Sequence, residues 1–263
     1  MSLHIESHGT GTPLVLIHGW GMHSGVWDNV VPELAQRFRV HCVDLLGHGY
    51  STPLPTFSPL HDKGLEMLDA IVDALSTQFD EPLNVCGWSL GGMVALRWAH
   101  LLPQQVLRLV LAASTPCFTA RKGWLYGLEE ERLQQFSAEL EQDHVAMLRR
   151  FVALLVRGST REREQLVYLR SRLLSRGEPE INSLLAGLEI LRDVDLRAAL
   201  PCILQPALVI AGKLDKVTLP EASCYMAQAL PNARVVEFAG AAHTPFLSHP
   251  EIFVEQLTDF LHG

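Results

Sequence analysis

The run Gly87-Trp-Ser-Leu-Gly-Gly92 constrains the fold more than any other stretch of this chain. A short apolar, strand-like run (83–86) precedes it, and an apolar, helix-like run (93–102) follows it. Glycines two positions before and two positions after Ser89 leave room for a sharp turn at that serine. The pattern therefore predicts a strand, a tight turn and a helix, with the serine side chain projecting above the edge of a sheet.

Short apolar runs alternate with helix-like segments along most of the chain, a pattern typical of a parallel sheet covered by helices on both faces. The runs that we expect to be strands are 13–17, 39–43, 83–86, 106–112, 207–211 and 234–238. The segments that we expect to be helices are 26–38, 60–79, 93–102, 220–230 and 250–261. The sequence thus predicts an α/β fold with a mostly parallel central sheet.

The alternation stops between positions 118 and 187. This segment is rich in Arg, Glu, Gln and Leu, has helical spacing and contains no strand-like run. Breaks occur at Gly158-Ser159 and at 177–179, and we expect about four helices in all. We therefore expect residues 1–117 and 188–263 to form an α/β core, with 118–187 inserted as a helical cap.

Composition narrows the class of protein further. The chain has 263 residues, of which 48% are hydrophobic and 19% are charged, so a large folded domain is expected. No apolar run is long enough to span a membrane, no secretory signal is visible, and five scattered cysteines suit a reducing cytosol. The net charge of −8 argues against nucleic-acid binding. We expect a cytoplasmic monomer that uses no metal and no other cofactor.

Two further polar residues follow predicted strands in the second half of the chain. Asp215 comes just after the 207–211 run, and His243 comes after the 234–238 run. Because the carboxyl ends of parallel strands meet at one edge of a sheet, Ser89 should lie close to both. In that arrangement His243 removes the proton of the serine hydroxyl, and Asp215 orients the imidazole and stabilises its charged form. The sequence therefore predicts a catalytic triad of Ser89, Asp215 and His243.

A nucleophilic serine also needs donors for the oxyanion that forms when it attacks a carbonyl. The backbone N–H of Leu90 is one candidate, because it directly follows the nucleophile. The second is expected from the glycine-rich loop 18–21, where the N–H of Trp20 is the best placed. Trp20 and Leu90 are therefore the predicted oxyanion hole.

Each of these residues also has a structural interpretation. Asp215 alone could be a turn residue, and His243 alone could be an ordinary loop histidine. Asp44 is a rival acid, because it also ends a predicted strand. Its setting in Asp44-Leu-Leu-Gly-His-Gly-Tyr-Ser51 favours a turn held by bonds from the backbone to the carboxylate. The joint occurrence of all the elements at successive strand ends favours the catalytic interpretation of Ser89, Asp215 and His243.

Together these stretches resemble the α/β-hydrolase superfamily over nearly the whole chain. The matching elements are 16–21, Asp44-x-x-Gly-His-Gly-x-Ser51, 87–92, Gly212-x-x-Asp215 and Gly240-x-x-His243. The sequence departs from the common pattern at Leu46, where proline is usual, and at Tyr50, where arginine is usual. Neither position belongs to the proposed chemistry.

Finer stretches resemble the pimeloyl-acyl-carrier-protein methyl ester esterases of biotin synthesis; they are 18–21, 87–92, 114–121, 187–197 and 241–250. The resemblance implies a serine carboxylesterase that hydrolyses the methyl ester of pimeloyl-carrier protein through an acyl-enzyme and releases methanol. It also implies that small esters are substrates. The residues that would line the substrate site are Trp20, Ser89, Leu90, Phe151, Val152, Ala153, Leu154, Leu155 and His243.

The segment 144–177 is strongly basic in an otherwise acidic chain. It contains eight arginines and two acidic residues, a net charge of +6, whereas the whole chain carries −8. Since carrier proteins are acidic, such a patch would steer one to the site. The alternative is a solvated helix surface whose arginines pair with glutamates at 129–131, 139 and 141. The expected docking residues are Arg149, Arg150, Arg157, Arg161 and Arg163.

Other functions of the same fold stay open at this point. A general short-chain carboxylesterase and a carbon–carbon bond hydrolase would use the same triad. A dehalogenase is disfavoured, because it normally needs a carboxylate where this chain has Ser89. A ligand-binding receptor without useful turnover is a further alternative, and it would be favoured if folded protein gave neither a burst of p-nitrophenol nor turnover with a short ester.

Overall fold

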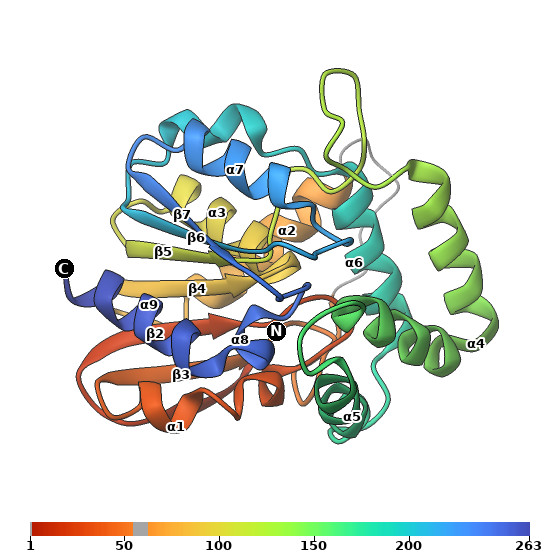
Figure 1. Ribbon diagram of the computed structural model, residues 1–263, viewed down its shortest axis with the longest axis horizontal. Coiled ribbons are helices and arrows are strands. Elements are labelled where there is room, and N and C mark those ends of the chain that lie inside the picture. The colour runs from red at the N-terminus through yellow and green to blue at the C-terminus, as the bar shows by residue number, and fades with distance from the viewer. Residues whose placement is uncertain (1, 55–62) are drawn as a thin grey trace.

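The computed structural model describes residues 2–54 and 63–263, and within them seven strands form one sheet (Figure 1). The strand order is β1-β3-β2-β4-β5-β6-β7, with β1 antiparallel to β3 and every other neighbouring pair parallel. The expected mostly parallel sheet is confirmed. The strands are β1 (His4–His8), β2 (Thr12–Ile17), β3 (Phe38–Asp44), β4 (Leu83–Trp88), β5 (Val106–Ala112), β6 (Ala207–Gly212) and β7 (Ala233–Phe238).

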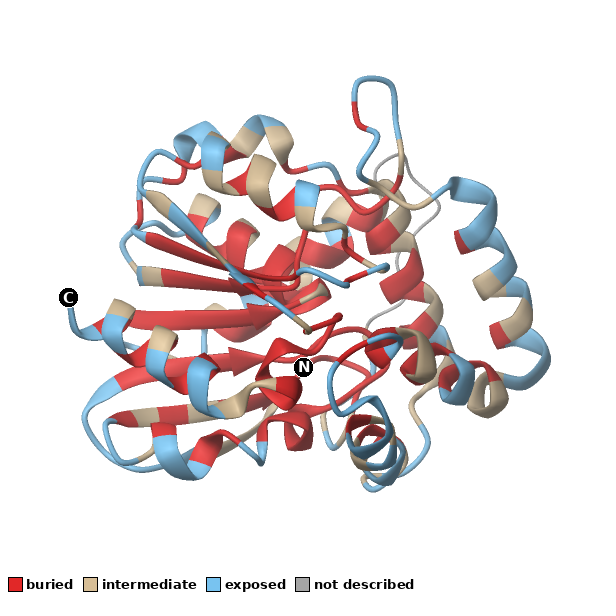
Figure 2. Cartoon of the chain, in the orientation of Figure 1, coloured by how far each residue is buried: buried red, intermediate tan, exposed pale blue. Residues whose placement is uncertain are grey.

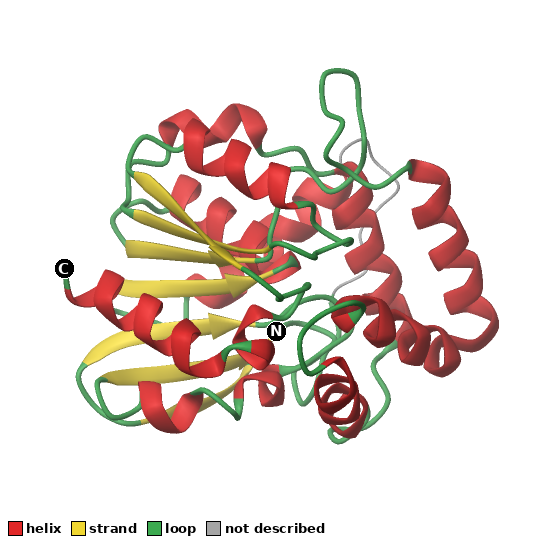
Figure 3. Cartoon of the chain, in the orientation of Figure 1, coloured by secondary structure: helices red, strands yellow, loops and turns green. Residues whose placement is uncertain are grey.

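Helices cover both faces of this sheet (Figure 3). In the orientation of Figure 1, α1 and α9 lie on one side and α2, α3 and α7 on the other. The core helices are α1 (Val31–Leu34), α2 (Lys63–Ser76), α3 (Leu90–Leu101), α7 (Pro220–Ala229), α8 (Pro245–Ser248) and α9 (Pro250–His262). The 3₁₀ helix η1 (Ser24–Trp27) completes the described elements of the core, and a second, η2 (Arg197–Cys202), precedes β6.

The centre of the sheet is the most deeply buried part of the molecule (Figure 2). Every residue of β4 and of β6 is buried, and so is every residue of β2 after Thr12. Parallel strands covered on both faces need apolar side chains in both directions, which explains their continuous apolar runs. This rigid centre carries the turn at Ser89.

The chain between β5 and β6, residues 113–206, is termed the insert. It contains α4 (Glu130–Val156), α5 (Glu162–Leu173) and α6 (Ile181–Asp193), which lie beyond the carboxyl ends of the parallel strands (Figure 1, right). Asp143 has non-helical backbone angles (φ −157°, ψ 87°) and divides α4 into two helical pieces. α6 packs against α2 of the core and continues past position 187, where the sequence places a domain boundary.

Two details differ from the sequence-based expectation. The single helix predicted over 26–38 is wrong: η1 and the short α1 take its place. Pro32 has no N–H to donate to the carbonyl of Asp28, so a continuous helix would lose a bond there. β1 was not predicted, because its residues are mostly polar. Of the helix expected over 60–79, positions 60–62 lie outside the described residues.

None of the described helices combines the length and the apolar character that crossing a membrane requires. The cytoplasmic location and the monomeric state stay predictions of the sequence.

Candidate active site

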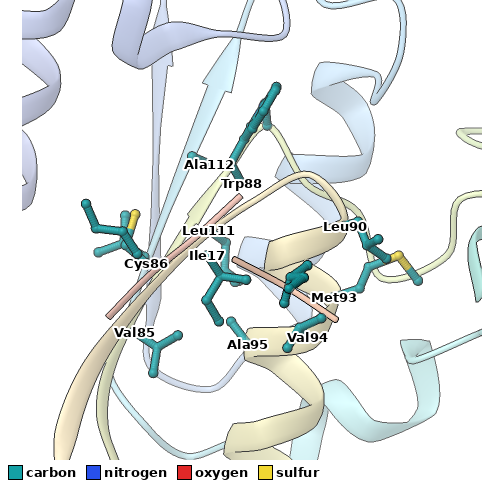
Figure 4. Packing of buried hydrophobic residues seen from close by; sticks show 14 of the residues in the cluster. Ile17, Val85, Cys86, Trp88, Leu90, Met93, Val94, Ala95, Leu111 and Ala112 are labelled. Carbon is teal, nitrogen blue, oxygen red and sulfur yellow. The ribbon is translucent and has the colours of Figure 1, made fainter. Parts of the chain in front are cut away.

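Ser89 sits at a strained turn between β4 and α3. Its backbone angles, φ 55° and ψ −119°, are rarely adopted by a residue with a side chain. A Cβ on Gly87 would overlap the carbonyl oxygen of Gly91, and a Cβ on Gly91 would overlap that of Ile17. The apolar packing around this turn, seen in Figure 4, holds the strained conformation in place. The two glycines are therefore required by backbone contact, as the sequence pattern indicates.

Asp215 and His243 form a buried hydrogen-bonded pair. His243 Nδ1 lies 2.8 Å from Asp215 Oδ2, and each side chain is only 1% exposed. Asp215 also accepts hydrogen bonds from the N–H groups of Val217 (2.8 Å) and Thr218 (3.0 Å) and from the Thr218 hydroxyl (2.9 Å). These donors fix the carboxylate in one orientation. A proton on Nδ1 then leaves Nε2 as the acceptor nitrogen of the neutral imidazole.

His243 Nε2 is buried and has no hydrogen-bond partner within the described residues. The structure has no hydrogen bond between this nitrogen and Ser89. Bonds between a nucleophile and its base are often long until substrate binds, so this geometry is compatible with a general base. A buried acceptor without a partner is costly, which marks Nε2 as an atom held ready for a proton.

The loop 240–244, termed the histidine loop, is anchored on both sides. The indole Nε1 of Trp88, the residue before the nucleophile, donates to the carbonyl of His243 at 2.7 Å. From the insert, the carbonyl of Leu155 accepts the His243 N–H at 2.9 Å. The strand that presents Ser89 and the insert therefore both fix the backbone of His243.

Two more bonds join the histidine loop to the insert. Thr160 N–H donates to the carbonyl of Gly240 at 2.7 Å. The Thr244 hydroxyl donates to Gln165 Oε1 at 2.8 Å, while Gln165 Nε2 donates to the hydroxyl of Ser159, also at 2.8 Å. Gln165 is buried although it is polar, and these bonds explain why. Sequence analysis missed its role, since only tertiary contacts reveal it.

The two predicted oxyanion donors lie beside the nucleophile. Leu90 is the first residue of α3, so its N–H has no helical carbonyl one turn earlier to accept it. Trp20 N–H donates to no acceptor in the described part of the chain. Its indole Nε1 donates to the carbonyl of Leu184 on α6 at 2.9 Å. The structure thus leaves both backbone donors available, and their role as an oxyanion hole stays a prediction.

Two buried histidines hold the loop that carries Trp20. His48 Nε2 accepts the N–H of Gly21 at 3.3 Å, and His18 Nε2 accepts the N–H of Leu45 at 2.9 Å. Burial, together with the nearby His48, lowers the pKa of His18 to about 3. Burial also lowers the pKa of His48. Both rings are therefore neutral acceptors near pH 7, a role that sequence analysis did not assign to them.

Asp44 is a structural acid, as its sequence setting predicts. Its carboxylate accepts the N–H groups of Ser24 (2.8 Å) and Tyr50 (2.9 Å) and pairs with Arg176 (2.9 Å). Burial by itself would raise the pKa of Asp44, but the neighbouring His18 and the N–H donors outweigh it and hold the pKa at about 2. Arg176 is only 11% exposed and also pairs with Glu6. Counting Arg176 in a basic surface patch was therefore wrong.

A largely apolar cavity of about 510 Å³ opens beside the nucleophile, between the insert and the loop after β6. A smaller pocket of about 10 Å³ touches Ser89 and Trp20 and shares four lining residues with the cavity. The shared residues are Phe118, Phe136, Phe151 and Val217. Because the two spaces share these side chains as walls, the cavity lies next to the pocket that touches the nucleophile.

The predicted substrate-lining stretch 151–155 is divided between two faces of α4. Phe151 and Leu154, three positions apart on the helix, line the cavity. Val152 and Leu155 are fully buried, and Leu155 holds the histidine loop. Ala153 is partly exposed and lines neither pocket.

The five predicted docking arginines are all exposed. Arg150 pairs with Glu139 at 2.7 Å, in accordance with the alternative of a solvated, paired surface. Arg161 lies 3.6 Å from Glu164, and Arg157 lines the cavity. Arg149 and Arg163 form no ion pair within the described residues. All five arginines are thus exposed on the insert, and the structure reveals no docking partner for them.

No cluster of three or more His, Cys, Asp or Glu side chains suited to a metal ion occurs among the described residues. The five cysteines of the chain form no disulfide.

Comparison with known proteins agrees with this geometry. Residues 12–250 match the family model described as alpha/beta hydrolase fold. A protein of Nitrosomonas europaea named pimeloyl-[acyl-carrier protein] methyl ester esterase is 46% identical over 96% of this chain and 97% of its own length. One of the same name from Nitrosospira multiformis is 37% identical over 99% and 98%. An esterase from Exiguobacterium antarcticum superimposes with a TM-score of 0.87 at 25% identity, covering 99% and 96% of the two chains. The chain belongs to the α/β-hydrolase family, together with the pimeloyl-[acyl-carrier protein] methyl ester esterases.

Proposed function

We propose that this protein is a serine esterase that hydrolyses the methyl ester of pimeloyl-acyl-carrier protein to pimeloyl-carrier protein and methanol. The names of its relatives, which match over nearly the whole chain, support the substrate. The observation that carries the chemistry is the buried Asp215–His243 pair, whose Nε2 has no partner, next to a strained Ser89. Membership of the family supports carboxylic ester hydrolysis independently.

The steps follow from the positions of these atoms. Ser89 Oγ attacks the ester carbonyl while His243 Nε2 takes its proton, and Asp215 stabilises the imidazolium. The N–H groups of Leu90 and Trp20 donate to the oxyanion of the tetrahedral intermediate. His243 returns the proton to the methoxide, so methanol leaves and an acyl-enzyme remains. Water, deprotonated by His243, then attacks the acyl-enzyme and releases the carboxylate and the serine.

The cavity beside the nucleophile suits an acyl chain. Phe136, Phe151 and Leu154 give it an apolar wall, which would bind methylene groups through the hydrophobic effect. We propose that residues 118–187 act as a cap over this chain. The acidic carrier would dock on the exposed arginines at 149, 150, 157, 161 and 163.

The test of the proposed reaction uses purified methyl pimeloyl-carrier protein. Wild-type protein should release methanol and a carrier with the free carboxylate, measured by mass spectrometry, whereas Ser89→Ala should lose a factor of roughly 10³ or more. In a biotin-requiring strain without its methyl ester esterase, only the wild type should restore growth. Failure of soluble wild-type protein in both assays would contradict the proposal.

Docking is tested separately with the triple variant Arg150→Glu, Arg157→Glu and Arg163→Glu. Turnover of the carrier-bound ester should fall, while hydrolysis of p-nitrophenyl acetate is spared. Equal losses on both substrates would exclude docking at these arginines.

A further inference from the structure

Cationic side chains from separate segments meet at the cavity beside Ser89. Among the described lining residues they are Arg132 in the first turn of α4, Arg157 at the end of α4 and Lys216 in the loop after β6. The break at Asp143 turns the two halves of α4 toward the same cavity. No acidic side chain lines the cavity within the described part of the chain.

Arg132, Arg157 and Lys216 have no acidic partner within the described residues, whereas six of the twelve arginines of the insert do. Within the described residues, Arg157 and Lys216 make no ion pair and no side-chain hydrogen bond. Arg132 makes only a 3.3 Å bond to Gln135 and lies over the ring of Phe136. By contrast, Arg150 and Arg176 both pair with carboxylates. Like charges gathered around an apolar cavity repel one another, and an anionic ligand would offset that repulsion.

The position of the cations relates them to the substrate. Phe118, Phe151 and Val217 line both this cavity and the pocket that touches Ser89. Lys216 directly follows the acid that orients His243. An ester held at Ser89 can therefore extend its chain across the apolar wall, so that its far end lies near the cations.

We propose that Arg132, Arg157 and Lys216, termed the cationic rim, form an anion subsite that selects esters with a phosphate or a carboxylate at the end far from the ester. The inference rests on the proposed function, which places the ester carbonyl at Ser89. The anion has two possible sources: the phosphate on the pantetheine arm of a carrier, or a free carboxylate on the acyl chain itself. Neither source requires contact with the carrier protein.

Matched pairs of small esters test the subsite without the carrier protein. The first pair is methyl pimeloyl-pantetheine and its 4′-phosphate. The second is dimethyl pimelate, corrected for its two equivalent esters, and monomethyl pimelate. Each exposed ion pair is weak, but several rim cations act on one anion, so the rim should favour the anionic member of at least one pair by about tenfold in kcat/KM. The preferred pair identifies the source of the anion.

The triple variant Arg132→Gln, Arg157→Gln and Lys216→Gln should abolish this preference, mainly by raising KM for the anionic ester. Added salt should weaken the preference of the wild type, because the rim side chains are exposed. Arg170→Gln, a matched charge change on α5 away from the cavity, should leave the preference intact. Arg157→Lys keeps the positive charge and should retain most of the preference for the anionic ester.

Equal rates within both pairs for the wild type, or a preference that survives in the triple variant, would overturn the subsite. If none of the four esters is hydrolysed, the proposed function fails instead. Calorimetry with Ser89→Ala protein then tests the rim alone, using the pantetheine pair as ligands. Tighter binding of the phosphorylated member that the triple variant loses supports the subsite, and equal binding of both members excludes it.

Discussion

Asp44 and Asp215 show how the same side chain takes two roles in one sheet. Asp44 ends β3 and Asp215 lies just after β6; both are buried, and both accept backbone N–H groups. They differ in the side chain that faces the carboxylate. Asp44 faces the guanidinium of Arg176, which stays charged at all relevant pH values, whereas Asp215 faces the imidazole of His243, which would take up and return a proton in the proposed reaction. The partner, more than the carboxylate, separates the structural acid from the acid that we propose to be catalytic.

The insert supports both pairs, but in different ways. It supplies Arg176 itself to Asp44. For Asp215 it supplies no side chain; instead Leu155, Thr160 and Gln165 hold the loop that carries His243. Disturbing the insert should therefore lower stability through Asp44 and lower the rate of the proposed reaction through Asp215 and His243.

The largest expected effect is a difference in the rate of ester hydrolysis between variants of Asp215 and Asp44. Asp215→Asn should lower kcat by about 10⁴, because an amide no longer holds the imidazole in the reactive tautomer. Asp44→Asn, measured under conditions where the protein is folded, should stay within about tenfold of wild type. Ester hydrolysis by the two purified variants makes the comparison. The reverse order of rates would make Asp44 the acid of the triad.

The ion pair of Asp44 with Arg176 should contribute mainly to the stability of the fold. Arg176→Met leaves a buried carboxylate without its cation and should lower the free energy of unfolding by about 3–5 kcal/mol, measured with urea. Combining it with Asp44→Asn should cost less than the sum of the single changes, because the unpaired charge is then removed. Additive losses in this double-mutant cycle would show that the pair is not coupled.

Acid should destabilise the Asp44 side of the molecule. His18 has a folded pKa of about 3 and an unfolded pKa near 6.5, so the unfolded chain takes up a proton first as the pH falls. This one group should remove about 1.4 kcal/mol per pH unit between pH 6 and 4. The lowered pKa of Asp44, about 2, adds a further loss as the pH falls from 4 toward 2.

Urea unfolding of wild type and His18→Asn at pH 7, 6, 5 and 4 measures this slope. The variant should show a shallower decline, by about one proton, between pH 6 and 4. If the free energy of unfolding fell equally steeply with pH in both proteins, His18 would bind its proton as tightly in the folded protein as in the unfolded chain.

The smallest effect concerns the bond between the insert and the histidine loop. Gln165→Leu removes the acceptor of the Thr244 hydroxyl and should lower kcat about three- to tenfold, equivalent to a hydrogen bond of about 0.5–1.5 kcal/mol. Gln165→Glu keeps an acceptor and should restore part of the rate. A shift in the pH profile of kcat/KM distinguishes positioning of His243 from a general loss of stability. Unchanged kcat and pH profile in a destabilised Gln165→Leu protein would limit Gln165 to a structural role.

The sequence predicted what short patterns specify. The turn at Ser89 follows from glycines that backbone contacts require, and the order of strands with polar ends led to Asp215 and His243. Contacts between segments far apart in the chain could not be predicted from these local patterns. Arg176 looked like one more surface arginine, because nothing near it in the chain indicates Glu6 and Asp44. Gln165 looked like part of a charged helix, and its bond to Thr244 spans 79 positions. Within the helix predicted over 26–38, the apolar spacing concealed the effect of Pro32.

The hydrogen bond from His243 N–H to the Leu155 carbonyl has a consequence for building chimaeric enzymes. A designer who exchanges residues 118–187 for the corresponding segment of another hydrolase also replaces the acceptor that fixes the base of the triad. Such a hybrid could fold well, bind its new substrate and still turn over slowly. Grafts should therefore end between the cavity-facing Leu154 and the carbonyl of Leu155, or restore an equivalent acceptor, so that specificity is changed without loosening the histidine.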